Sequence, residues 1–300
     1  MDIKEKVSRK LQPGKYVIAV SGGIDSVVLL DIVSRIKGLE LIVAHFDHGI
    51  RTDSKLDQTF VGNLATKYQL IFETKSVKLG SNASEQLARD ERYKFLKTVV
   101  DAQGAEGIIT AHHQDDVIET AVFNLLRGTG RRGVTSLSSS ELIIRPMLDI
   151  TKDQIKQYAL RHELLWREDS TNQDLKYSRN LIRSKLAGKN GSVVNKLLTR
   201  IDKLKATNQE LDDALDQLLI NVTKDGKLLR AKFISLSHGL ALETMAKWLR
   251  LNGITEYDSK LLNNLVIASK TYKNRSRFSI NKAAYLLIET EFLVIKTTTS

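Results

Sequence analysis

The chain has 300 residues, of which 42% are hydrophobic and 27% charged, and it contains no cysteine. The length predicts two globular domains, and the absence of thiols excludes disulfide frameworks, Cys nucleophiles and Cys-ligated metal sites. The net charge of +11 is uneven: residues 1–150 hold 20 Lys and Arg against 19 Asp and Glu, whereas residues 151–300 hold 26 against 16. The excess in the second half is typical of a surface that binds a polyanion, although a solubilising surface has the same composition.

The N-terminal residues lack the order of a secretory signal peptide, and no apolar run approaches the roughly 18 residues of a membrane span. We therefore expect a cytoplasmic protein without membrane segments.

The first half of the chain alternates short apolar runs with helical patterns. Helices are predicted over residues 27–36, 56–70 and, opened by a capping box of Asn82 and Glu85, through Val100. Strands are predicted over residues 16–20, 39–46, 71–74 and 107–111. This alternation predicts an α/β fold with a doubly wound parallel sheet, whose ligand crevice lies at the carboxyl ends of the strands.

The pattern changes after residue 148. Residues 151 to about 216 are mostly helical and basic, and strand patterns return only at 284–288 and 292–295. We place a domain boundary near residue 190. The prediction is a catalytic domain over 1–190 and a smaller, mainly helical, basic domain over 191–300 that begins with a long linking helix.

The segment Ser21-Gly22-Gly23-Ile24-Asp25-Ser26 lies between the first strand and the first helix. Its backbone N–H groups and the helix N-terminus form an anion site, and phosphate is the obvious anion. The Gly-Lys-Ser/Thr ending of a Walker A loop is absent. The glycines allow close backbone approach, and Asp25 is suited to hold Mg²⁺ against pyrophosphate oxygens. The alternative is a capped glycine turn.

Two histidine clusters follow predicted strands: His45 with His48, and His112 with His113. These positions place the histidines at the crevice, which favours catalytic or substrate-positioning roles over a structural role. A zinc site is disfavoured because no HExxH spacing and no cysteine is present. The carboxylates of Asp115, Asp116 and Glu119 follow the second cluster on one helical turn. They either complement the helix dipole or act on a substrate.

Basic residues accompany these clusters. Arg89 and Arg92 share a helix face, either in salt bridges or at an anion. Arg127 opens a glycine-rich segment with Arg131 and Arg132, where Gly128 predicts a helix stop and the arginines could also close over phosphates.

These motifs follow one another along the chain, and Arg145-Pro146 and Arg179-Asn180-Leu181-Ile182-Arg183 come after them. The SGGIDS segment resembles the PP-loop of the N-type ATP pyrophosphatases, which have an adenine nucleotide alpha hydrolase-like fold. The ordered series over about residues 15–185 is similar to the tRNA(Ile)-lysidine synthetase family. Long members of that family carry an additional C-terminal domain, and we expect this chain to end after the first one.

The resemblance implies a ligase that uses ATP and Mg²⁺ to join L-lysine to C2 of the wobble cytidine in tRNA(Ile) with a CAU anticodon. The cytidine is first adenylated, AMP and pyrophosphate are released, and the codon read changes from AUG to AUA. Oligomeric state stays open between a monomer and a homodimer.

The resemblance also implies site residues. Those at the nucleotide are Ser21, Gly22, Gly23, Ile24, Asp25, Ser26, His45, Asp47 and Arg89, with Asp25 as the metal ligand. Those at the other substrates are Arg92, Asp115, Asp116, Glu119, Arg127, Arg179 and Arg183. The catalytic candidates are Asp25, His112, His113, Asp116 and Glu119.

The sequence bears on three rival functions. tRNA thiolases of the same superfamily need cysteines, which this chain lacks. Amidating relatives such as GMP and NAD synthetases need ammonia, usually from a glutaminase partner, and no such domain is visible. A nonenzymatic RNA-binding protein that keeps an inert nucleotide fold is the rival from another class.

Overall fold

A computed structural model describes residues 2–49, 54–78, 80, 84–168, 182, 185 and 191–297. The chain forms two compact units, Met1–Leu204 and Lys205–Ser300. The sequence placed a functional boundary near residue 190, where a long helix begins, whereas the compact units divide within that helix. A division of function at residue 190 stays a prediction.

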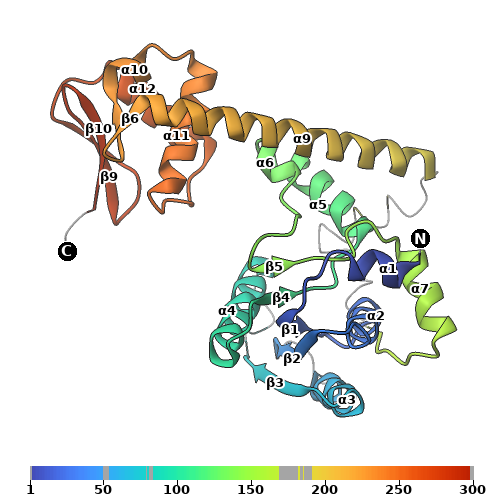
Figure 1. Ribbon diagram of the computed structural model, residues 1–300. Helices are drawn as coiled ribbons and strands as arrows, with labels where there is room; N and C mark the ends of the chain where they lie inside the picture. The colour runs from blue at the N-terminus through green and yellow to red at the C-terminus, as the bar shows by residue number, and fades with distance from the viewer. Residues whose placement is uncertain are drawn as a thin grey trace. The chain divides into compact units, whose positions relative to one another are not determined.

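The N-terminal unit contains a five-stranded, fully parallel sheet of order β3-β2-β1-β4-β5, so the predicted doubly wound sheet is confirmed (Figure 1). Its strands are β1 (Gly14–Ala19), β2 (Leu39–Asp47), β3 (Ile71–Ser76), β4 (Gly107–Ile109) and β5 (Ile143–Ile144). Its helices are α1 (Ile3–Ser8), α2 (Ile24–Val33), α3 (Ser54–Lys67), α4 (Glu85–Gln103), α5 (Gln114–Leu126), α6 (Arg131–Val134) and α7 (Lys152–Arg161), and α9 (Gly191–Val222) begins here.

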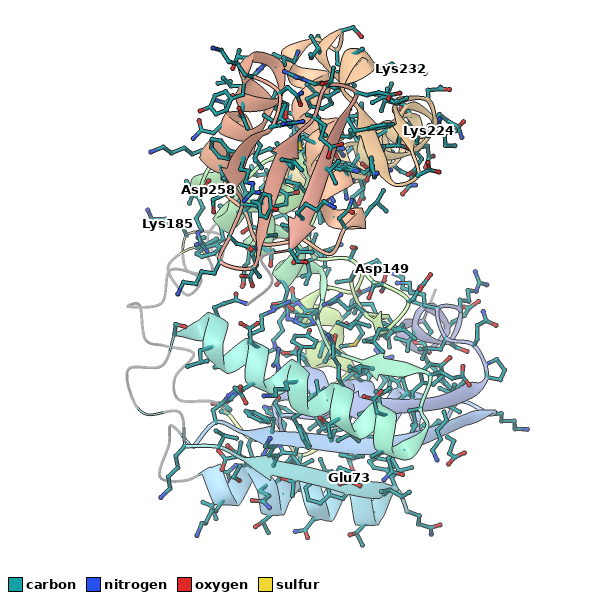
Figure 2. All side chains as sticks on the ribbon, turned by 90° about the vertical axis from the view of Figure 1, so that its left-hand side faces the viewer. Glu73, Asp149, Lys185, Lys224, Lys232 and Asp258 are labelled. Atoms are coloured by element: carbon teal, nitrogen blue, oxygen red, sulfur yellow. The ribbon has the colours of Figure 1, made fainter. Side chains whose placement is uncertain are left out.

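Alternate side chains of each strand enter different cores, because successive residues of a strand point to opposite faces. Val17, Ile42 and Ile108 pack under α4, whereas Ile18, Val43 and Ile109 pack against α1, α2, α3 and α7. Figure 2 shows α4 lying along the sheet, and Gln103 at its end donates to Glu73 on β3, 2.8 Å away. Both faces of the sheet are thus covered, which leaves its carboxyl edge as the place for a site.

The start of α4 differs from the sequence prediction. Ser84 is the N-cap, and its side chain accepts a hydrogen bond from the Leu87 N–H at 3.1 Å. The predicted capping box was therefore wrong: Glu85 is the first helical residue, two positions too early for a partner of Asn82 at N3, and Asn82 lies outside the described residues.

The C-terminal unit holds a second five-stranded sheet, antiparallel and of order β6-β7-β10-β9-β8. It consists of the end of α9, β6 (Thr223–Lys224), β7 (Lys227–Leu229), α10 (Arg230–Ile234), α11 (His238–Leu251), α12 (Ser259–Thr271), β8 (Ser276–Ser279), β9 (Ala284–Ile288) and β10 (Phe292–Thr297). Trp248 and Phe233 lie in its core. The predicted strands near the C-terminus are confirmed. None of the helices described is both long enough and apolar enough to cross a membrane.

A buried carboxylate ties three helices of the N-terminal unit together. Asp31 on α2 is fully buried and accepts hydrogen bonds from the Tyr68 hydroxyl at 2.7 Å, the Tyr158 hydroxyl at 2.8 Å and the Arg35 guanidinium at 2.8 and 3.1 Å. Burial alone would raise the pKa of Asp31, but these hydrogen bonds outweigh it and lower the pKa. The ionised carboxylate therefore fixes α7 against α2.

Asp31→Asn is expected to lower the free energy of unfolding by about 3 kcal/mol at pH 7, because an amide cannot accept all of these bonds. Since folding lowers the Asp31 pKa, its contribution is complete above the unfolded value of about 3.9 and is lost as the pH falls through the folded value. Urea unfolding at pH 7 measures this effect, and Asp101→Asn, at an exposed position of α4, is the control. A loss no larger than in the control would contradict the bracing role.

Candidate active site at the carboxyl edge of the parallel sheet

The PP-loop follows β1 and leads into α2. Gly22 has φ +92°, a conformation that favours glycine, and Gly23 is the N-cap of α2 without a capping side chain. The Ser26 hydroxyl donates to the Gly23 carbonyl at 2.8 Å and accepts from the Ser21 N–H at 3.2 Å. The loop is thus fixed from within, and the first turn of α2 presents its N–H groups as an anion site should.

Asp25, in that first turn, is ion-paired. The ammonium of Lys152, the first residue of α7, lies 2.6 and 2.7 Å from its two oxygens. His113 Nε2 lies 3.7 Å from the same carboxylate. Asp25 and His113 were predicted from the sequence as site residues, but Lys152 was not. The one sequence signal for Lys152 is its position directly after the Thr151 cap, where the helix dipole disfavours a cation.

The start of α5 brings the second histidine cluster to the same place. His113 is the N-cap, its backbone N–H donates to Asp116 Oδ2 at 2.9 Å, and its Nε2 lies 3.6 Å from that oxygen. Asp115 and Asp116 are half-buried, whereas Glu119 is only 3% exposed. The structure therefore brings Asp25, His113 and Asp116 together.

Basic side chains gather around Tyr93 on α4. The guanidinium groups of Arg89 and Arg92 lie 5.2 and 5.4 Å from the ring centroid, and Arg145 after β5 donates to the Tyr93 hydroxyl at 3.3 Å. Burial and then the Arg89 and Arg145 charges lower the pKa of Arg92. Arg145 is 7% exposed and appeared in the sequence analysis only within a motif.

His112 and His48 adjoin this cluster and are held neutral. Burial, followed by the charges of Arg92, Arg145 and Arg89, places the pKa of His112 well below its usual 6.5, and its Nδ1 lies 2.9 Å from the Thr110 hydroxyl. Burial and the charge of Arg92 also lower the pKa of His48. An imidazolium is thus disfavoured at residue 112 near neutral pH.

Two residues expected at the nucleotide have firm contacts of their own. His45 Nδ1 donates to the Val20 carbonyl at 2.9 Å, and its buried Nε2 has no hydrogen-bond partner in the described part of the chain. Asp47 accepts from the Gly49 N–H at 2.8 Å and from the Ser76 hydroxyl at 3.2 Å. Asp47 therefore closes the turn after β2, and its role at the nucleotide stays a prediction.

The basic segment after α5 contains the expected helix stop. Gly128 has φ +67°, and the exposed Arg127 lies over the Phe123 ring at 5.1 Å. Arg179 and Arg183 lie outside the described residues. Upstream of them, the Arg167 N–H donates to the Gly22 carbonyl at 3.0 Å, and its guanidinium pairs with Asp57 on α3. The sequence analysis missed this attachment to the PP-loop, because it joins segments 145 residues apart in the chain.

Comparison with known proteins agrees with this architecture. A family model described as a PP-loop domain matches residues 2–189. The tRNA(Ile)-lysidine synthase of Wigglesworthia glossinidia brevipalpis is 32% identical over 297 residues, covering 89% of this chain and 73% of that protein. The synthase of Thermotoga maritima is 34% identical over 220 residues, covering 70% of this chain and 50% of that protein.

Among solved structures, the U34-tRNA thiolase NcsA from Methanococcus maripaludis matches with a TM-score of 0.53 at 19% identity, covering 67% of this chain and 77% of that one. That likeness concerns the fold alone. The fold, the ordered motifs and the matches over most of the chain lead to one conclusion: this chain belongs to the PP-loop family of tRNA(Ile)-lysidine synthases.

Proposed function

We propose that this protein ligates lysine to C2 of the wobble cytidine in tRNA(Ile) with a CAU anticodon, at the expense of ATP. The observation that carries the proposal is the convergence of the PP-loop, Asp25, His113 and Asp116 at one edge of the sheet. The relatives named above, tRNA(Ile)-lysidine synthases, support the choice of reaction.

In the first step the C2 oxygen of cytidine attacks the α-phosphorus of ATP, and the bond to pyrophosphate breaks. Ser21, Gly22, Gly23, Ile24 and Ser26 would cradle the leaving pyrophosphate, with the start of α2 facing the negative charge that develops on it. His45, Asp47 and Arg89 are the further proposed nucleotide residues.

Asp25 fits a Mg²⁺ ion. Within the described residues no three His, Asp or Glu side chains form a metal-binding group, so the protein alone offers no complete cage. A nucleotide-bound Mg²⁺ needs only one or two carboxylates beside phosphate oxygens and water. The partly exposed Asp25 at the phosphate loop meets that need, and the ion would neutralise the leaving group.

In the second step the neutral ε-amine of lysine attacks C2, AMP leaves, and the amine gives up a proton. Asp116 and Glu119 are the proposed acidic residues for the lysine side chain, and Arg92 and Arg145 are the proposed basic residues for its carboxylate. Carboxylates would attract the side-chain ammonium, and guanidinium groups would attract the carboxylate. His112 is a poor proton acceptor because of its depressed pKa, which leaves His113 and the carboxylates as candidates.

Labelled lysine tests the function. The protein is incubated with labelled lysine, ATP, Mg²⁺ and an unmodified tRNA(Ile) transcript bearing CAU, and each component is omitted in turn. We expect stable transfer of label to RNA only in the complete mixture. A tRNA-binding protein that releases no pyrophosphate and transfers no label would belong to the nonenzymatic class.

The partner tRNA implies phosphate contacts by the basic segment after α5, by Arg179 and Arg183, and by residues 191–300. Affinity for tRNA should fall with salt, with a log–log slope of about 0.7–0.9 per contact. Replacing exposed Arg127 by alanine is expected to reduce that slope by about one contact, measured by filter binding over a salt series. Arg9→Ala at the C-cap of α1 is the control, and equal slopes for both variants would remove Arg127 from the RNA surface.

A further inference from the structure

Lys152 sits at the meeting point of two helix N-termini. It is the first residue of α7, its ammonium contacts the second residue of α2, and both helices are ten residues long. Thr151 and Gln154 cap α7 reciprocally, with the Thr151 N–H 3.0 Å from Gln154 Oε1 and the Gln154 N–H 3.2 Å from Thr151 Oγ1. The Asp31–Tyr158 bond holds α7 against α2. The position of Lys152 beside the PP-loop is therefore built in.

A purely structural purpose explains this lysine poorly. The dipole of α7 works against a cation in its first turn. The side chains of Lys152 and Asp25 remain 35% and 29% exposed, and ion pairs with this degree of exposure usually contribute little to the stability of a fold. Two positive helix ends and an ammonium at one point instead suit a strongly charged anion.

The ion pair with Lys152 also occupies the carboxylate of Asp25. The ammonium contacts both carboxylate oxygens, so a metal ion at Asp25 would compete with Lys152 for these atoms and repel its charge. A lysine side chain has a flexible four-carbon stem and can shift its ammonium within the site. A suitable new partner for it is the pyrophosphate group that the PP-loop would hold.

We propose that Lys152 is a pyrophosphate-binding residue, which neutralises Asp25 before the nucleotide binds and transfers its ammonium to the phosphates when a cation takes Asp25. This inference rests on the proposed function, since it assumes a magnesium pyrophosphate site at the PP-loop.

The test compares Lys152→Met with Lys156→Met, an exposed lysine one turn later on α7. Binding of Mn²⁺ alone is followed by electron paramagnetic resonance, and binding of inorganic pyrophosphate with Mg²⁺ by calorimetry. In Lys152→Met, affinity for Mn²⁺ alone should rise about tenfold, because the competing ammonium is gone. Affinity for magnesium pyrophosphate should fall about 10- to 100-fold, the effect of one charge-assisted hydrogen bond. Lys156→Met should change neither.

The two opposite shifts separate this inference from its rivals. Weaker binding of both Mn²⁺ and magnesium pyrophosphate would indicate that Lys152 only supports the loop, and would overturn the proposed transfer of its ammonium. Unchanged binding of both probes would also overturn the proposal. If the methionine variant does not fold, Lys152→Arg provides the second test: a retained cation should keep pyrophosphate affinity within about threefold of wild type, and a tenfold loss would overturn the assignment. Failure of the wild-type protein to bind magnesium pyrophosphate would instead refute the proposed function itself, and this inference with it.

Discussion

Asp25→Asn is expected to reduce ATP-dependent pyrophosphate release at least about 100-fold, because the substitution removes the only carboxylate of the PP-loop. The side chain is 29% exposed and its ion pair with Lys152 is open to solvent, so the free energy of unfolding should change by no more than about 1 kcal/mol. Pyrophosphate release with tRNA present and urea unfolding measure the two quantities.

Asp153→Asn is the matched control, since Asp153 is exposed on the first turn of α7 beside Lys152. It should retain wild-type release. Turnover of Asp25→Asn within about threefold of wild type would refute the assignment of the metal to this carboxylate, whereas an unfolded variant would show that the pair with Lys152 supports the fold.

Asp116→Asn and Glu119→Gln are expected to raise the KM for lysine at least about tenfold or to abolish ligation, while pyrophosphate formation without lysine survives. The reason is that each substitution removes a carboxyl group that the proposed lysine site would use and keeps the size of the side chain. Asparagine also keeps an oxygen that can accept from the His113 N–H, so the start of α5 should persist. Label transfer and pyrophosphate release, measured over a lysine series, separate the two steps.

Asp90→Asn on the exposed face of α4 serves as the control for these variants. Loss of both steps in Asp116→Asn would place this acid at the metal or in the structural frame. An unchanged lysine KM would remove it from the amino-acid site.

The parallel sheet could be predicted because its strands are buried on both faces and therefore appear as continuous apolar runs, such as residues 16–20 and 107–111. The C-terminal sheet was only partly predictable, because β6 and β7 contain two and three residues and β8 has alternating exposure without a strong apolar pattern. Short strands of this kind form through pairing with their neighbours, β6 with β7, β7 with β10 and β8 with β9, which sequence-local signals do not encode.

In the candidate site, too, local sequence patterns predicted some residues, whereas residues with distant partners were missed. Asp25, His113 and Asp116 were predictable because they stand directly after strands or in the first turn of a helix, at the edge where parallel strands end. Lys152, Arg145 and Arg167 required the structure, because their partners Asp25, Tyr93 and Gly22 are distant in sequence. Long-range ion pairs and hydrogen bonds leave no periodic signal in either segment.

The hydrogen bond from Arg167 to the Gly22 carbonyl has a thermodynamic consequence. It connects the phosphate loop directly to the segment that leads toward Arg179 and Arg183. If filling the loop strengthens this bond, linkage requires that any ligand which stabilises the bond tighten nucleotide binding by the same factor. One backbone contact would then couple the affinity for the nucleotide to the affinity for a second ligand bound at Arg167.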